Sequence, residues 1–188
     1  MKKLLLAVAI IAMVAVLAAP SNAQGKMTLS IGPDVLLPMG SSADVFSIGF
    51  GGTARFQYNF TPMASAGLTA GYFSFTGKDL GVPGASFKPS QSGVPVRVFG
   101  KYYFMPEGKL RAYGIVELGL FFWSFKTTVP FFGEISTTGS DFNYAPGIGV
   151  EIPAGKVAVD VSVRYDGFSS GGSSAGNLGA RVGVNFPI

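Results

Sequence analysis

Residues 157–166 constrain the fold of this chain more than any other segment, because their polarity alternates with a period of two. The odd positions hold Val157, Val159, Val161, Val163 and Tyr165, and the even positions after Ala158 hold Asp160, Ser162, Arg164 and Asp166. This period predicts a β-strand with one apolar face and one polar face. Soluble β-sandwiches contain such strands as well, so the other strands must decide which face lies inside.

Seven further segments alternate in the same way. They cover 27–37, 45–60, 64–75, 94–104, 110–125, 141–152 and 177–188. Short turns are predicted at 61–63, 105–109 and 153–156, a small polar loop at 39–44, and long loops at 76–93, 126–140 and 169–176. No segment after residue 23 has the 3.6-residue period of a long amphipathic helix. The chain is therefore predicted to be all-β, with one domain after residue 23.

Residues 1–23 are predicted to be a secretory signal peptide. Two lysines precede an apolar run over 4–19, and Ser21 and Ala23 place small residues at the exit of that run. The run is shorter than the roughly 20 residues of a spanning helix. We therefore favour cleavage after Ala23 over a membrane anchor, which leaves 24–188 as the mature domain.

Composition removes several classes of function. The chain has no cysteine, so neither disulfides nor thiolate metal sites can form. It also has no histidine, the commonest general base and metal ligand. Without the signal peptide, 12 basic and 10 acidic side chains remain, which is too mild a balance to indicate nucleic-acid binding. We expect no cofactor and no metal.

All charged residues of the eight segments lie on the same face. The apolar face has none, and the other face has six basic and five acidic residues: Asp34, Arg55, Arg97, Lys101, Arg111, Glu117, Glu151, Asp160, Arg164, Asp166 and Arg181. An Arg or Lys facing lipid costs about 2–4 kcal/mol at the bilayer midplane, so a charge-free face suits hydrocarbon. Open strand edges cannot be hydrated there. We therefore predict an eight-stranded antiparallel up-and-down transmembrane β-barrel with its charges in the lumen.

Aromatic residues gather at both ends of the predicted strands. Tyr58, Phe60, Tyr102, Phe104 and Phe186 lie at the short-turn end, and Phe46, Tyr72, Phe122, Phe142 and Tyr165 lie toward the long-loop end. We interpret them as the two interfacial girdles of a barrel, with short turns on the periplasmic side and longer loops outside. Phe121 and Trp123 are assigned to the outer girdle rather than to a ligand site.

The mature sequence resembles the small OmpA/OmpX-type outer-membrane β-barrel family, through its eight strands in phase after a signal peptide. Its last residues, Arg181-x-Gly183-x-x-Phe186-x-Ile188, resemble the family's terminal assembly signal, although the chain ends on isoleucine rather than on an aromatic residue. The resemblance implies a bacterial outer-membrane location, contact with membrane lipid, biogenesis by the barrel-assembly machinery and a monomeric state. Because the sequence stops at Ile188, we also expect no periplasmic peptidoglycan-binding domain of the kind that larger relatives carry.

Three prolines fit less well into this scheme. Pro33, Pro95 and Pro146 fall within or at the start of predicted strands, although proline cannot donate to a β-ladder. We expect bulges or strand ends at these positions.

Glu117 and Asp160 could be read as a catalytic carboxylate pair, but neutralisation is the better interpretation. An eight-stranded lumen is only wide enough for side chains to fill it, and an unpaired buried charge is costly. We expect the two acids to neutralise Arg55, Arg97 and Arg181 at mid-barrel height. The predicted structural network contains Arg55, Arg97, Lys101, Arg111, Glu117, Glu151, Asp160, Arg164 and Arg181.

Two functions remain open. Small barrels that modify lipids use a serine–histidine pair, which this chain cannot form, so we predict that it is not an enzyme. The favoured hypothesis is a structural or surface-interaction barrel that acts through its extracellular loops, whose partner the sequence leaves open. The alternative is a narrow conduit or a small-ligand-binding barrel. Phe99, Tyr103 and Tyr113 would crowd the lumen and favour the first hypothesis.

Overall fold

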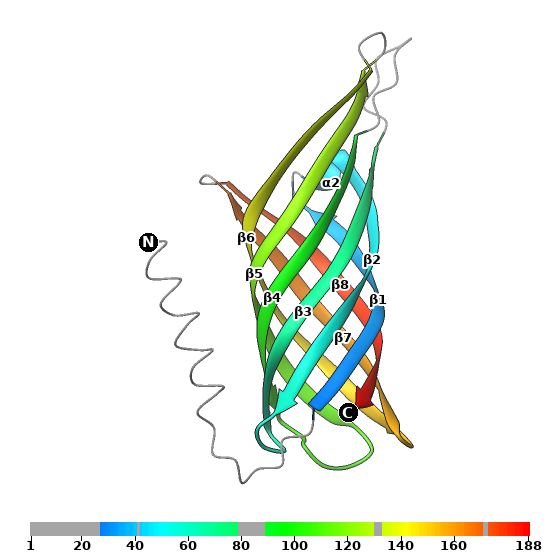
Figure 1. Ribbon diagram of the computed structural model, residues 1–188, viewed down its shortest axis with the longest axis vertical. Helices are drawn as coiled ribbons and strands as arrows, with labels where there is room; N and C mark the ends of the chain where they lie inside the picture. Colours follow the sequence, from blue (N-terminus) through cyan, green and yellow to red (C-terminus); the bar gives the residue numbers. More distant parts are fainter. Residues whose placement is uncertain (1–26, 41, 79–88, 130–132, 171–172) are drawn as a thin grey trace.

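The computed structural model describes residues 27–40, 42–78, 89–129, 133–170 and 173–188. Eight antiparallel strands form a closed barrel in which each strand pairs with the next and β8 pairs with β1 (Figure 1). The strands are β1 (Met27–Met39), β2 (Phe46–Asn59), β3 (Ala64–Gly77), β4 (Ser90–Tyr103), β5 (Arg111–Val129), β6 (Gly133–Ala154), β7 (Val157–Ser170) and β8 (Ser173–Pro187). The predicted fold class is confirmed.

The burial of side chains shows that the polar face of each strand lies inside the barrel. On β7, Asp160, Ser162 and Arg164 are buried in the lumen, whereas Val161 and Val163 point outward with 38% and 46% of their surface exposed. The same alternation runs around the barrel and leaves a broad outer band of exposed Val, Leu, Ile and aromatic side chains. Such a band requires a hydrocarbon environment. Among the described residues, no helix is long and apolar enough to cross a membrane.

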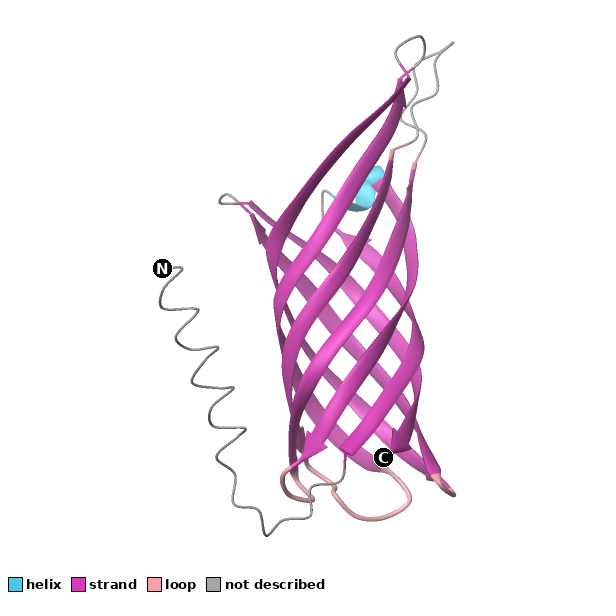
Figure 2. Ribbon diagram, in the orientation of Figure 1, coloured by secondary structure: helices cyan, strands magenta, loops and turns pink. Residues whose placement is uncertain are grey.

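The two ends of the barrel differ. Short connections join the strands at one end (Figure 2). Gly108 and Gly155 adopt positive φ angles in two of them. At the other end, which we call the loop end, the β5–β6 hairpin rises beyond its neighbours (Figure 1). A short helix, α2 (Ser42–Val45), lies in the segment predicted to be a loop at 39–44.

The strands at the loop end are longer than predicted. Part of each segment assigned to a long loop is strand: β3 runs to Gly77, β4 begins at Ser90, β5 runs to Val129, and β6 begins at Gly133. The strands β7 and β8 likewise extend into the loop predicted at 169–176. These extensions lie beyond the apolar band, so both of their faces tolerate Ser, Thr and Gly. Their sequence therefore lacks the alternation of polar and apolar residues from which the other strands were predicted.

The prediction of bulges or strand ends at the three prolines is wrong, because each lies inside a strand and none shifts the register. The β1–β8 pairing skips Gly32 and Pro33 and then resumes in the same register. The β3–β4 pairing skips Pro95 in the same way, and the β6–β7 pairing skips Pro146. Each proline keeps its partner on the opposite neighbouring strand. The barrel therefore loses ladder contacts on one side only, because the N–H that proline lacks would face only one of the two neighbouring strands.

One register irregularity does occur, between Phe46 and Gly49 on β2. It turns Phe46 toward the lumen, where its ring centroid lies 6.2 Å from that of Phe75 and 6.3 Å from that of Phe125. The assignment of Phe46 to the outer lipid-facing girdle is therefore wrong, because an irregularity of this kind changes the face on which the preceding residues lie.

Candidate functional site in the barrel lumen

The eleven charged residues of the strands project into the lumen. All are buried except Arg111, whose side chain is 30% exposed at the turn end. Each of them makes at least one ion pair with another member of the set. Six cations therefore meet five anions inside a space too narrow for bulk solvent.

Eight of these side chains form a closed ring in which positive and negative charges alternate, which we call the charge ring. Its contacts, in order, are Arg55–Glu117 (2.8 Å), Glu117–Arg97 (2.9 Å), Arg97–Asp166 (2.7 Å), Asp166–Arg164 (2.9 Å), Arg164–Asp34 (2.5 Å), Asp34–Arg181 (3.9 Å), Arg181–Asp160 (2.9 Å) and Asp160–Arg55 (3.6 Å). The members come from β1, β2, β4, β5, β7 and β8, so the ring ties opposite walls of the barrel together.

The longest contact in the ring, between Asp34 and Arg181, is reinforced by neutral side chains. The Thr53 hydroxyl donates to Asp34 Oδ2 at 2.7 Å and accepts from Arg181 Nε at 2.8 Å. Ser30 accepts a further bond from Arg181 Nη2 at 2.9 Å. Hydrogen bonds to charged groups are stronger than neutral ones, so these hydroxyls help to offset the cost of burying Arg181.

A branch of the network runs from Asp160 toward the turn end. Lys101 lies 3.5 Å from Asp160 and 2.9 Å from Glu151, which in turn pairs with Arg111 at 3.3 Å. The Tyr113 hydroxyl donates to Asp160 at 2.6 Å. Lys101 Nζ also lies 4.2 Å from the centroid of the Tyr113 ring, within the range of a cation–π interaction.

The arrangement opposes catalysis by the two central acids. Glu117 is held by Arg55 and Arg97, and Asp160 by Arg55, Arg181 and Lys101. Both carboxylates are fully buried, so neither presents a free oxygen to a substrate. Arg181, which we expected to be shared by the two acids, pairs with Asp160 and Asp34. In the part of the chain that the structure describes, no group of three or more acidic side chains is arranged to hold a metal ion.

Two apolar clusters lie in the lumen, one toward each end. Toward the turns, Phe99, Tyr103, Tyr113 and Ile115 pack together. Toward the loops, Leu36, Phe73, Phe75 and Phe121 form a second cluster, which we call the aromatic cap. Phe46, Trp123 and Phe168 pack against the cap.

Two residues of this region correct the sequence analysis. Phe121 is buried and Trp123 is partly buried, with its indole Nε1 donating to Asp141 at 2.9 Å. Of the three consecutive aromatic residues, only Phe122 faces outward, as part of the girdle. Extending the alternation of β3 and β5 past the apolar band would have placed Phe73, Phe75, Phe121 and Trp123 inside.

A family model described as the outer membrane protein beta-barrel domain matches residues 4–186. The chain belongs to this family. It is therefore a bacterial outer-membrane protein, and its apolar band contacts the lipid bilayer. The family members and structural neighbours are outer-membrane barrels rather than enzymes. No curated protein matches the chain in sequence.

Solved structures show the same fold at low sequence identity. Ail, the attachment invasion locus protein of Yersinia pestis, is 18% identical, with a TM-score of 0.55 over 86% of this chain and 99% of Ail. Neisserial surface protein A is 13% identical, with a TM-score of 0.58 over 86% and 97% of the two chains. A major outer-membrane protein from Thermus thermophilus is 13% identical, with a TM-score of 0.63 over 88% and 100%.

The terminal motif of this family member covers the end of β8 and the residue that follows it, with side chains both inside and outside the barrel. Arg181 and Gly183 are buried in the lumen, whereas Phe186 is 42% exposed and Ile188 is 68% exposed. Arg181 thus belongs both to the charge ring and to the motif, whose role in assembly stays a prediction. The predicted signal peptide, residues 1–23, lies outside the described residues.

Proposed function

We propose that this protein is a non-conducting outer-membrane barrel that holds surface segments at its loop end for interaction with other molecules. The observation that carries the proposal is the closed charge ring. Its members belong to six strands and neutralise one another across the lumen. A conduit would have to break buried ion pairs, and breaking one typically costs about 3–5 kcal/mol.

The aromatic cap supports the same proposal. Leu36 and Phe73 are 2% and 0% exposed, and they lie between the charge ring and the loop end of the lumen. Arg164 of the ring lies under the cap, with its Cζ 5.8 Å from the centroid of the Phe73 ring. A solute entering from outside would therefore meet the apolar side chains of the cap before it met the charge ring. This order suits a plug better than a polar channel.

The β5–β6 hairpin supports the interaction part of the proposal. Within the described residues, the segment 133–141 of β6 pairs with β5 alone, because pairing with β7 begins only at Phe142. Its free edge leaves backbone groups available to another extended chain. The outer face of the hairpin carries Ser124, Ser136, Thr138 and Ser140, which suits a solvated surface above the membrane.

Planar-bilayer recordings on the purified mature protein test the proposal. We expect no single-channel steps from the native protein. Asp166→Ala, which removes the acid shared by Arg97 and Arg164, should produce small steps by opening the charge ring. Regular conductance from the native protein would refute the plug and support the narrow conduit instead.

We also propose that the chain is monomeric and is assembled by the barrel-assembly machinery. Light scattering in detergent measures the mass of the particle and so checks the monomeric state.

A further inference from the structure

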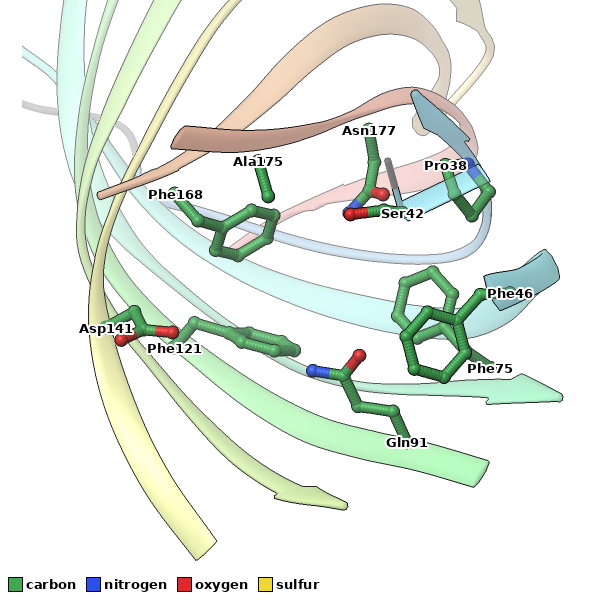
Figure 3. A pocket seen from close by; sticks show the side chains of 10 residues that line it. All are labelled: Pro38, Ser42, Phe46, Phe75, Gln91, Phe121, Asp141, Phe168, Ala175 and Asn177. Carbon is green, nitrogen blue, oxygen red and sulfur yellow. The ribbon is translucent and has the colours of Figure 1, made fainter. Parts of the chain in front are cut away.

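A cavity of about 110 Å³ lies at the loop end of the lumen, between residues of the aromatic cap and the side chains that pack against it (Figure 3). Phe121 and Phe168 lie on one side of it, and Phe46 and Phe75 lie on the other. The two rings of the first pair are 5.2 Å apart between centroids, and those of the second pair are 6.2 Å apart. Four phenyl groups from four strands therefore enclose one small space.

The polar lining of this cavity is limited and includes one charge. Gln91 and Asn177 bring amide groups to it from β4 and β8, Ser42 of α2 brings a hydroxyl, and Asp141 of β6 brings a carboxylate. One oxygen of Asp141 accepts the bond from Trp123 Nε1. Among the described residues, no cation pairs with Asp141, in contrast to the carboxylates of the charge ring. The cavity thus has an aromatic wall and a negative charge that no cation of the described residues neutralises.

We propose that this cavity binds a small organic cation with a quaternary-ammonium group. Phenyl faces attract cations, and the attraction grows when the site is desolvated. Asp141 adds a charge of the sign that favours a cation and disfavours an anion. The cations of the charge ring are each held by carboxylates, and none of them lines the cavity.

The size of the cavity limits the ligand. Sites for drug-sized molecules measure roughly 300–1,000 Å³, so a cavity of about 110 Å³ holds a group of only a few heavy atoms. A trimethylammonium group fits this limit, whereas a peptide or an oligosaccharide does not. The amides of Gln91 and Asn177 can bond a hydroxyl or ester attached to that group.

Trp123 makes binding directly measurable, because it is the only tryptophan of the chain and is bonded to Asp141. The native mature protein in maltoside detergent, which carries no ammonium group, is titrated with choline and, separately, with the neutral isostere 3,3-dimethylbutan-1-ol. We expect a saturable fluorescence change with choline and at least about tenfold weaker binding of the alcohol. Equal affinities, or no saturable response to millimolar choline, overturn the proposal.

Two matched variants separate the proposed site from non-specific effects. Asp141→Asn retains an oxygen for the Trp123 bond but removes the charge, and it should weaken choline binding several-fold without affecting the alcohol. Glu107→Gln removes an exposed carboxylate at the opposite end of the barrel and should leave both affinities unchanged. Choline affinity that is unaltered in Asp141→Asn refutes the role of the carboxylate and with it the proposed cation site.

Glycerophosphocholine distinguishes the two sources of the ligand. If it competes with choline, the cavity accepts the ammonium of a phospholipid headgroup; if it fails to compete, the ligand is a free small cation. Each result is consistent with the proposed chemistry and identifies where the cation comes from. The titrations with choline and the alcohol use the native protein, so they remain decisive if a variant does not fold.

Discussion

Removing the charge of Glu117 tests the lumenal network most directly. In Glu117→Gln, Arg97 keeps a close partner in Asp166 at 2.7 Å. Arg55 keeps only Asp160 at 3.6 Å, and it must share that acid with Arg181 at 2.9 Å. The uncompensated charge therefore falls mainly on Arg55.

The expected loss of stability follows from this geometry. Removing one partner of a buried ion pair costs about 3–5 kcal/mol. The amide oxygen of glutamine can still accept one hydrogen bond, so we expect a value near the lower end, about 3 kcal/mol. Adding Arg55→Gln removes the stranded charge, and the double variant should recover about 2 kcal/mol relative to additive losses, within the range for residues in contact.

Urea unfolding in phospholipid vesicles, followed by the fluorescence of Trp123, measures these free energies. The mobility of unheated samples on gels gives an independent fraction folded. The coupling energy is the difference between the stability loss of a double variant and the sum of the two single losses. With Glu117→Gln, it should be largest for Arg55→Gln and smaller for Arg97→Gln. It should be smallest for Arg181→Gln, which alters a residue paired with other acids. Additive losses for Glu117 and Arg55, or equal coupling to Arg181, would refute the contacts of the charge ring.

Three further perturbations test other parts of the barrel. Val161→Arg places a charge on the lipid face and should cost about 2–4 kcal/mol in vesicle unfolding, whereas Val161→Leu should be nearly neutral; a harmless arginine would mean that the two faces are reversed. Gly32→Ala should cost about 1–3 kcal/mol, because its Cβ would meet the β8 backbone, whereas Gly100→Ala has open space and serves as its control in the same assay. Phe186→Ala should slow assembly by the purified barrel-assembly machinery more than it lowers equilibrium stability; an unchanged assembly rate would remove Phe186 from the terminal signal.

The sequence by itself determined the class of fold and the environment of each face. Alternation with a period of two identifies strands from local residues alone, because successive side chains of a strand point to opposite faces. The absence of charge from one face in all eight segments then assigns that face to lipid. The lumenal positions of Arg55, Glu117 and Asp160 follow from the same phase.

Only the tertiary structure decided which lumenal charges meet. Partners such as Arg164 and Asp34 are 130 residues apart and lie on strands whose relative stagger is set by barrel closure, which local sequence does not encode. The same limit applied at the loop end, where polar residues on both faces hid the strand extensions. There the register irregularity of β2 brought Phe46 inside to face Phe121, and it is this packing across the lumen that forms the cavity of the aromatic cap.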